Sequence, residues 1–398
     1  MNKKISLGAA VTFMCIVAAV TFSITMVVSA RLFDSKVFNI KEREAMYNKL
    51  ANIDQLVRTN YSGEIDEENL LDYLAIGYLA GIGDPYASYM RATEYETAQK
   101  NSSGKSIGIG MEIVKDSSGY YVVTDVYTNS PAEGAGMKRG DLIVSLGGKD
   151  LSQVKSAELN DLLYGDSGST LSLTLRREGE DIPLEVVRRE CEITSVYSRM
   201  IGEDGYIRIS QFNDATVKQF ASALASLQSQ GAKSLIFDLR DNGGGIIKSA
   251  AEILDTLLPE GDIVSGTMKD GQTKVLYTSD ANEVDLPMVV ITNKNTASAA
   301  ELFAAAIRDY NKGKLVGLNT YGKGVMQGTY KLTDGSAVEM TIGYFNPPSG
   351  QNFQGVGLKP DFESALSSEN EKKLYSLTDE QDTQLKKAIE VANSLKNS

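Results

Sequence analysis

The chain has 398 residues, which corresponds to two or three domains at about 150 residues each. Hydrophobic residues make up 42% and charged residues 23%, as in globular proteins, and the net charge of −12 disfavours a nucleic-acid partner. Because no histidine occurs, imidazole catalysis and histidine-ligated metal sites are excluded. The cysteines, Cys15 and Cys191, cannot form a disulfide framework, and we predict no metal or other cofactor.

An uncharged stretch near the N-terminus is long enough to cross a membrane. Residues 5–30 provide 26 positions without a charged side chain, and about 20 residues span the hydrocarbon core. Lys3 and Lys4 precede this stretch and favour an N-terminus held inside, with the remainder of the chain exported. The alternative is a cleaved signal peptide, because the small residues at 28–30 suit a signal peptidase. We favour the anchor.

The next segments are predicted to be helical and then β-rich. Apolar residues at helical spacing over residues 41–82 indicate two helices, and Gly83-Asp84-Pro85 ends the second. The polar residues 99–105 are expected to form a linker. Alternating runs at 120–123 and 171–175 then predict a small β-rich module.

Beyond residue 205 the pattern is that of an α/β core. Apolar strands at 234–239 and 288–291 alternate with helical stretches, which indicates a buried sheet covered by helices. Near the end, Thr378 and Gln381 have the spacing of a capping box and precede an amphipathic helix. Neither this helix nor the pair at 41–82 has an obvious partner surface, so together they predict a homodimer.

Three motifs suggest chemistry that the rest of the sequence does not support. Residues 165–168 read Gly-Asp-Ser-Gly, but that serine-protease signature needs a histidine, so we predict a turn. Ser152 has the S-x-x-K spacing of penicillin-binding enzymes without their other motifs, and we predict a helix cap. Residues 241–249 resemble a phosphate-binding loop, but Ile247 replaces the glycine that precedes its lysine.

Ser298 has two interpretations. It lies between the strand at 288–291 and a helix that runs towards Tyr310, and its spacing to Glu301 is that of a capping box. The serine could therefore simply cap the helix. It could also be a nucleophile, because free N–H groups and the positive dipole end at a helix N-terminus suit an oxyanion.

A serine nucleophile in a chain without histidine requires a different base. A lysine acts as a base only when neutral, so burial must lower its pKa from about 10.4 to about 7, at a cost of about 4 kcal/mol. Lys323 lies between two glycines and before apolar residues. Gln327 could orient it, provided that the backbone bends near Gly324, because four residues of regular strand span about 13 Å. The alternatives are a solvated turn lysine and an ordinary strand glutamine.

The spacing of these three residues resembles that of the carboxyl-terminal processing proteases, also called tail-specific serine peptidases. Lys323 follows Ser298 by 25 residues and Gln327 follows Lys323 by 4. The resemblance extends to residues 205–212, 238–245 and 355–361.

This resemblance implies a role for each site residue. Ser298 would be the nucleophile, Lys323 the general base and Gln327 the residue that positions the lysine. The backbone amides of Gly244 and Ala299 would form the oxyanion hole. Position 243 is a glycine where the family usually has proline, so the loop before Gly244 is expected to be more flexible.

The β-rich module resembles the PDZ domain of the same family, on the evidence of residues 130–143 and 147–149. The resemblance implies that a substrate C-terminus binds at Ile107, Gly108, Ile109 and Gly110. A glycine-bearing loop before a strand can offer backbone amides to a terminal carboxylate while the peptide adds as a strand. For Gly108 and Gly110 alone, a plain turn is the alternative.

We therefore predict a multidomain chain with an N-terminal membrane helix, a helical segment, a PDZ domain and an α/β, crotonase-like serine peptidase core. The predicted regions are residues 1–35 (anchor or signal), 36–100 (helical), 101–190 (PDZ), 191–365 (peptidase) and 366–398 (C-terminal helical). The predicted function is a bacterial, membrane-anchored, extracytoplasmic endopeptidase that recognises protein C-termini and cleaves through an acyl-enzyme. The alternatives are a PDZ-type peptide-binding scaffold with an inactive core and an acyl-CoA enzyme on the crotonase-like fold.

Overall fold

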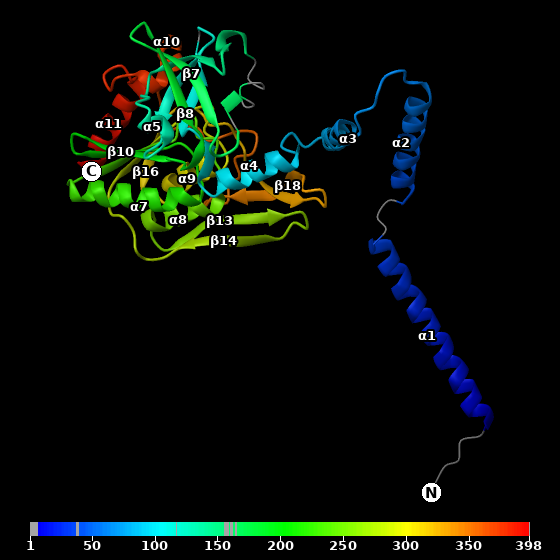
Figure 1. The fold of residues 1–398 in the computed structure, drawn as a ribbon. Coiled ribbons are helices and arrows are strands. Elements are labelled where there is room, and N and C mark those ends of the chain that lie inside the picture. Colours follow the sequence, from blue (N-terminus) through cyan, green and yellow to red (C-terminus); the bar gives the residue numbers. More distant parts are fainter. Residues whose placement is uncertain are drawn as a thin grey trace. The chain divides into compact units, whose positions relative to one another are not determined.

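A computed structural model describes residues 7–36, 40–116, 118–154, 159, 162–163 and 165–397, and the chain divides into units Met1–Leu71 and Asp72–Ser398. The first unit contains α1 (Leu7–Lys36), α2 (Ile40–Asn60) and the start of α3 (Glu67–Gly81) (Figure 1). The two helices predicted within residues 41–82 are confirmed. Within α1, Ala10–Ser29 is exposed and has a mean hydropathy of 2.4, so this helix is long and apolar enough to cross a membrane.

The second unit opens with a segment that the sequence analysis described incorrectly in part. After α3 come β1 (Ser88–Met90) and α4 (Ala92–Ser102), so most of the predicted linker at 99–105 is the last turn of a helix. Polar residues such as Gln99 and Lys100 are good helix formers, and polarity alone does not indicate a linker. Asp72 anchors the segment by accepting hydrogen bonds from Tyr89 at 2.7 Å and from Arg91 at 2.5 Å.

The β-rich module forms as predicted around its own core, which includes Val123, Ile143, Leu146 and Leu175. Its antiparallel sheet has the order β3-β4-β5-β7-β8, with β6 on β5, while β2 pairs with β9. The elements are β2 (Lys105–Gly108), β3 (Met111–Lys115), β4 (Tyr121–Val126), α5 (Pro131–Gly134), β5 (Leu142–Leu146), β6 (Lys149–Asp150), η1 (Leu151–Gln153), β7 (Thr170–Arg177), β8 (Glu180–Val187) and β9 (Arg189–Glu192).

Two of the dismissed motifs lie in this module. Residues 165–168 lead into a turn as predicted, with Ser169 N–H donating to the Asp166 carbonyl at 3.0 Å. The prediction for Ser152 is wrong, because this residue lies inside η1. Asp150 is the cap, and its carboxylate accepts the Ser152 N–H at 2.9 Å.

The α/β core is built on a six-stranded sheet of order β10-β11-β12-β15-β16-β19, in which only the β10–β11 pair is antiparallel. The predicted strands at 234–239 and 288–291 are β12 and β15. The elements are β10 (Val196–Ile201), β11 (Asp204–Ile209), α7 (Asp214–Ser229), β12 (Ser234–Asp238), α8 (Ile247–Leu257), β15 (Met288–Thr292), α9 (Ala299–Asp309), β16 (Gly313–Gly317), β19 (Phe362–Glu363), α10 (Ser368–Lys372), η2 (Leu374–Ser376) and α11 (Thr383–Lys396).

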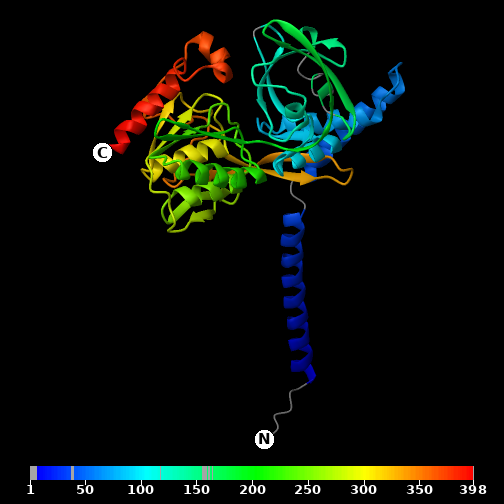
Figure 2. The same ribbon diagram turned by 60° about the vertical axis from the view of Figure 1, so that its left-hand side comes forward.

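Helices cover both faces of this sheet. The main core packs α7, α8 and α9 on one face, and α11 lies on the other, as Figure 2 shows. The C-terminal helix therefore has a partner surface within its own chain, contrary to our expectation, and its residues Leu385, Ala388 and Val391 are buried there. The predicted start of α11 was also wrong. Asp382 caps this helix, whereas Thr378 N–H donates to the Gln381 side chain in a preceding turn.

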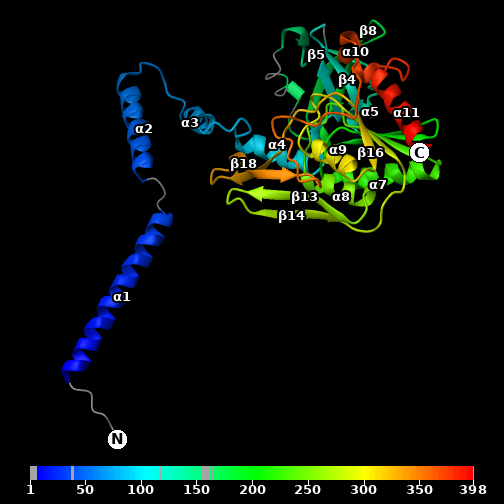
Figure 3. The same ribbon diagram turned by 180° about the vertical axis from the view of Figure 1, so that it is seen from behind.

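A second sheet lies beside the core. Strands β1, β18, β13 and β14 pair in that order, and β17 also pairs with β18. Figure 3 shows β13, β14 and β18 running side by side. The bounds of the new strands are β13 (Gly261–Met268), β14 (Thr273–Ser279), β17 (Val325–Lys331) and β18 (Ala337–Asn346). Through β1, the segment before the β-rich module joins this second sheet.

Candidate active site

Ser298 lies at the turn between β15 and α9, as predicted. Its φ of 57° places it in the left-handed region, where a residue other than glycine costs about 1–3 kcal/mol. The surrounding loop resists relaxation of this turn. The Thr296 hydroxyl donates to the Leu239 carbonyl at 2.8 Å, and Ala297 N–H donates to the Asn242 carbonyl at 2.9 Å. The loop after β12 therefore holds the strained serine in place.

The fully buried Glu301 joins the serine turn to the lysine loop. One carboxylate oxygen accepts the N–H groups of Ser298 at 2.9 Å and Lys323 at 2.8 Å. The other accepts the Thr320 hydroxyl at 2.5 Å and Gly322 N–H at 2.7 Å. Burial raises the pKa of the Glu301 carboxyl, and these four hydrogen bonds oppose the rise. A single side chain thus fixes the backbone at both Ser298 and Lys323.

The two glycines beside Lys323 permit a close backbone approach. A Cβ on Gly322, which has a φ of 92°, would lie 2.8 Å from the nitrogen of Gly357. A Cβ on Gly324 would lie 2.7 Å from the Asn352 side-chain oxygen. Such distances are shorter than ordinary van der Waals contacts, so a larger residue would displace the lysine loop.

The half-buried Lys323 is held by Gln327. The Lys323 Nζ donates to Gln327 Oε1 at 2.5 Å, and the Gln327 amide donates to the Tyr86 carbonyl at 2.8 Å. The ring of Tyr86 lies 5.2 Å from the same Nζ, a cation–π distance. This contact is possible because β17 starts only at Val325 and its pairing with β18 shifts register before Gln327. The backbone therefore departs from a regular strand after the lysine, as the sequence required.

Ser298 and Gln327 line one cavity of about 510 Å³. Its walls combine apolar and polar side chains, and Lys248 and Glu339 add opposite charges. The apolar side chains are those of Ile246, Ile247, Leu276, Val325 and Met326. A peptide side chain fits a space of this size and character.

The two predicted oxyanion donors differ in their surroundings. Gly244 has a φ of 102°, and a Cβ there would lie 2.8 Å from both the Ala297 carbonyl and the Ser298 Cβ. Its N–H donates to the Asn242 side chain at 2.8 Å, so binding an oxyanion requires this bond to open or be shared. The Ala299 N–H, in the first turn of α9, has no acceptor among the described residues.

The predicted peptide-binding residues Ile107, Gly108, Ile109 and Gly110 line a smaller cavity of about 170 Å³ in the β-rich module. Gly108 ends β2, and Gly110 has a φ of 79°. The N–H groups of Ile109 and Gly110 find no acceptor in the described part of the chain, while their carbonyls accept Ala132 and Tyr127 N–H. Two amides are therefore available for a carboxylate.

Comparisons with known proteins agree with this architecture. Residues 204–364 match peptidase family S41, and residues 122–177 match the PDZ domain. The carboxy-terminal processing protease CtpA of Bacillus subtilis (strain 168) is 31% identical over 326 residues, which cover 81% of this chain and 70% of that protein. The chain belongs to peptidase family S41, the carboxy-terminal processing proteases.

Two further similar proteins match over most of the chain. The carboxy-terminal-processing protease of Bartonella bacilliformis (strain ATCC 35685) is 30% identical over 353 residues, which cover 87% of this chain and 80% of that protein. The solved structure of a photosystem II D1 C-terminal processing protease has a TM-score of 0.51 and 27% identity, and the likeness covers 83% of this chain and 92% of that one. The chain is therefore a serine protease of the S41 family with a PDZ domain.

Sequence reasoning missed two contributors to the candidate site. Glu301 was assigned only a capping role, although the same spacing from Ser298 leads it to the lysine loop. Tyr86 was overlooked because Gly83-Asp84-Pro85 was interpreted only as a helix stop. Asp84 accepts the N–H groups of Thr341 at 2.8 Å and Tyr86 at 3.0 Å, which holds this segment beside the lysine. The available signal was the stretch of polar and aromatic residues after Pro85, which has no helical periodicity and so could have indicated a loop that contributes to the site.

Proposed function

We propose that Ser298 and Lys323 form a catalytic dyad that cleaves peptide bonds in exported proteins after their C-termini bind the PDZ domain. The observation that carries the proposal is Glu301, whose single buried carboxylate ties the backbone of the serine to that of the lysine. A serine that merely caps a helix has no need of this link to Lys323.

The mechanism assigns one task to each group. Ser298 Oγ attacks the scissile carbonyl carbon, and its proton passes to the neutral Lys323 amine. The Ala299 N–H, with Gly244 once its bond to Asn242 opens, stabilises the oxyanion. Collapse of the tetrahedral intermediate expels the amine, which takes the proton from Lys323 and leaves an acyl-enzyme. Water then attacks this ester with Lys323 again as base, and Gln327 keeps the amine in position.

In the structure the Lys323 amine is bound to Gln327 rather than to Ser298. We propose that substrate binding moves Nζ towards Ser298 Oγ. This movement would take the amine away from the ring of Tyr86, which lies 5.2 Å from Nζ in the structure.

Substrate capture is assigned to Ile107, Gly108, Ile109 and Gly110. The free N–H groups of Ile109 and Gly110 support binding of a terminal carboxylate, and β3, at the edge of the module's sheet, would accept the peptide as an added strand. The physiological substrate is a peptide or protein with a free C-terminus.

We further propose the predicted domain limits 1–35, 36–100, 101–190, 191–365 and 366–398, a crotonase-like core, and a single-pass anchor formed by α1. The parallel strands flanked by α7, α8 and α9 support the core assignment. Lys3 and Lys4 support a cytoplasmic N-terminus in a bacterial membrane, with the peptidase outside the cytoplasm. Protease accessibility of the PDZ domain in intact spheroplasts tests the topology, and release of the mature chain into the medium would indicate a cleaved signal instead.

We also propose a homodimer, in which α2 contacts a second copy. Its apolar residues Leu50, Ile53, Leu56 and Val57 are 39–64% exposed, and exposed apolar surface of this kind is typical of protein–protein interfaces. Light scattering on protein lacking residues 1–35 should give a dimer at micromolar concentration, and Ile53→Asp should give a monomer. A monomer without the substitution would contradict the proposal.

The decisive experiment for the dyad compares Ser298→Ala and Lys323→Ala with the wild type in cleavage of a peptide that has a free C-terminus. Each variant should stay folded and lose measurable turnover, because removing either member of a nucleophile–base unit costs about as much as removing both. Gln327→Ala should be milder.

A fluorophosphonate separates the alternatives. It should label the wild type and leave Ser298→Ala unlabelled. A binding scaffold with an inactive core would not be labelled, and an acyl-CoA enzyme would retain its activity after the substitution at Ser298. Near-normal turnover by Lys323→Ala would show that another residue is the base.

A further inference from the structure

Asp241 lies where the loops of the candidate active site meet. It has a φ of 59°, and its Oδ1 accepts the side-chain amides of Asn293 at 2.8 Å and Asn295 at 2.7 Å. Its own N–H donates to Asn293 Oδ1 at 3.0 Å. The next residue, Asn242, accepts Ala297 N–H. Both ends of the loop that leads to Ser298 are therefore tied to this dipeptide.

Tyr375, in η2 of the C-terminal region, binds the other oxygen of the same carboxylate. Its hydroxyl donates to Asp241 Oδ2 at 2.6 Å. Burial is the largest cause that raises the pKa of the Tyr375 phenol above its ordinary value, and the negative charge of Asp241 is the next largest. The hydroxyl consequently keeps its proton at neutral pH and acts as a donor. This hydrogen bond completes the set of partners that orient the carboxylate.

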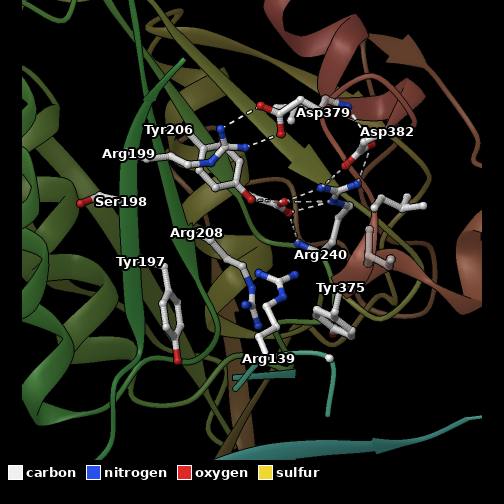
Figure 4. Close-up of a pocket in the computed structure, with 15 residues that line it drawn as sticks. Arg139, Tyr197, Ser198, Arg199, Tyr206, Arg208, Arg240, Tyr375, Asp379 and Asp382 are labelled. Atoms are coloured by element: carbon white, nitrogen blue, oxygen red, sulfur yellow. Dashed lines mark hydrogen bonds and ion pairs between the residues drawn. The ribbon is translucent and has the colours of Figure 1, made fainter. Parts of the chain in front are cut away.

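The ring of Tyr375 is held independently of its hydroxyl. It lines a pocket of about 510 Å³ in which Arg208 lies between the rings of Tyr197 and Tyr375, each 5.1 Å from the guanidinium carbon (Figure 4). Arg208 also forms a buried ion pair with Asp125 of the PDZ strand β4. The phenol is thus fixed by contacts that reach the PDZ domain, and the direction of its hydroxyl follows from that position.

We propose that Tyr375 is a positioning residue for the peptidase reaction, acting through Asp241 on the loop that ends at Ser298. The inference rests on the proposed role of Ser298 as nucleophile. A carboxylate with one oxygen released can rotate, and Asn293 and Asn295 then lose their fixed acceptor. Because a small displacement of a nucleophile has a large effect on rate, the C-terminal region contributes to catalysis in addition to covering the sheet.

The test compares Tyr375→Phe with Tyr197→Phe in the full chain. Both substitutions remove a phenol hydroxyl and keep a ring beside Arg208, but the Tyr197 hydroxyl donates only to the Thr194 carbonyl, at 2.9 Å. We expect Tyr375→Phe to lower kcat about 10-fold, or about 1.4 kcal/mol, with KM unchanged. A fluorophosphonate should label the same fraction of molecules about 10-fold more slowly. Tyr197→Phe should stay within about two-fold of the wild type.

A double variant with Asp241→Ala tests the route. Without the carboxylate, Tyr375→Phe should change kcat by less than about two-fold, because the two residues act in series. The inference would be overturned by an unchanged kcat in Tyr375→Phe or by an equal fall of kcat in Tyr197→Phe. It would also be overturned by a reduced labelled fraction, or by a full 10-fold effect of Tyr375→Phe in the Asp241→Ala background. Turnover retained by Ser298→Ala would instead refute the proposed nucleophile, so the two failures are distinct.

Discussion

Glu301→Gln should impair both stability and catalysis although it changes the side chain by only one group. Each carboxylate oxygen accepts two hydrogen bonds, so an amide nitrogen at either position must face two donors. The less costly orientation places the nitrogen towards Thr320, whose hydroxyl oxygen can accept. Gly322 N–H then remains buried without an acceptor, which costs about 1–3 kcal/mol.

The same defect displaces the loop that carries Lys323, and a displacement of about 1 Å can reduce turnover about 100-fold. We therefore expect Glu301→Gln to lose about 1–3 kcal/mol in urea unfolding and about two orders of magnitude in kcat for a peptide with a free C-terminus. Glu252→Gln, on the exposed face of α8, is the matched control and should stay within about 0.5 kcal/mol and at normal kcat. Wild-type stability and kcat in Glu301→Gln would refute the reasoning.

The pH dependence gives a second readout of Glu301. Since burial raises its pKa, kcat of the wild type should fall on the acid side at a pH above the ordinary glutamate value of about 4.3. A carboxyl whose pKa is higher in the folded than in the unfolded state adds to the free energy of unfolding. This contribution is fully present below the unfolded-state pKa and is lost as pH rises through the folded-state pKa. The stability advantage of the wild type over Glu301→Gln should therefore decrease with rising pH in the window where kcat increases.

Three further predictions follow from the site and its supports. Gly244→Ala should lower kcat for the same peptide more than about 100-fold, because the added Cβ would contact Ala297 and Ser298 and a shift of about 1 Å at Ser298 suffices for such a loss. Gly243→Ala, with open space around the added Cβ, should have a nearly normal kcat. Asp382→Ala should cost about 3–5 kcal/mol in urea unfolding, since it removes the cap of α11 and leaves the buried Arg240 with one ion-pair partner fewer, while Asp379→Ala at the exposed Arg199 should cost less than about 1 kcal/mol. Amidating the C-terminus of a bound peptide should weaken its affinity about 10- to 100-fold in calorimetry, and equal affinities for acid and amide forms would contradict capture through the amides of Ile109 and Gly110.

Local patterns in the sequence were sufficient for the elements that carry the site. The buried strand at 288–291, followed by a serine and a helical stretch, predicted the turn at Ser298, because hydrophobic periodicity and capping depend on neighbouring residues. The spacing of Ser298, Lys323 and Gln327 was likewise readable, and the glycines around Lys323 indicated a close backbone approach that the structure contains. The absence of histidine restricted the possible bases before any fold was considered.

Contacts between distant segments were decided only by the tertiary structure. The polarity of residues 99–105 did not reveal that Gln99 and Lys100 continue α4, a helix in which no residue is buried. The amphipathic pattern of α11 identified an apolar face but not the surface that it covers, because such a face packs equally well on its own sheet or on another chain. Three of the four donors to Glu301 come from residues 320–323, and the Tyr375 hydroxyl lies 134 residues from Asp241 in sequence. Hydrogen bonds of this kind depend on where folding places each backbone, which no periodicity along the chain encodes.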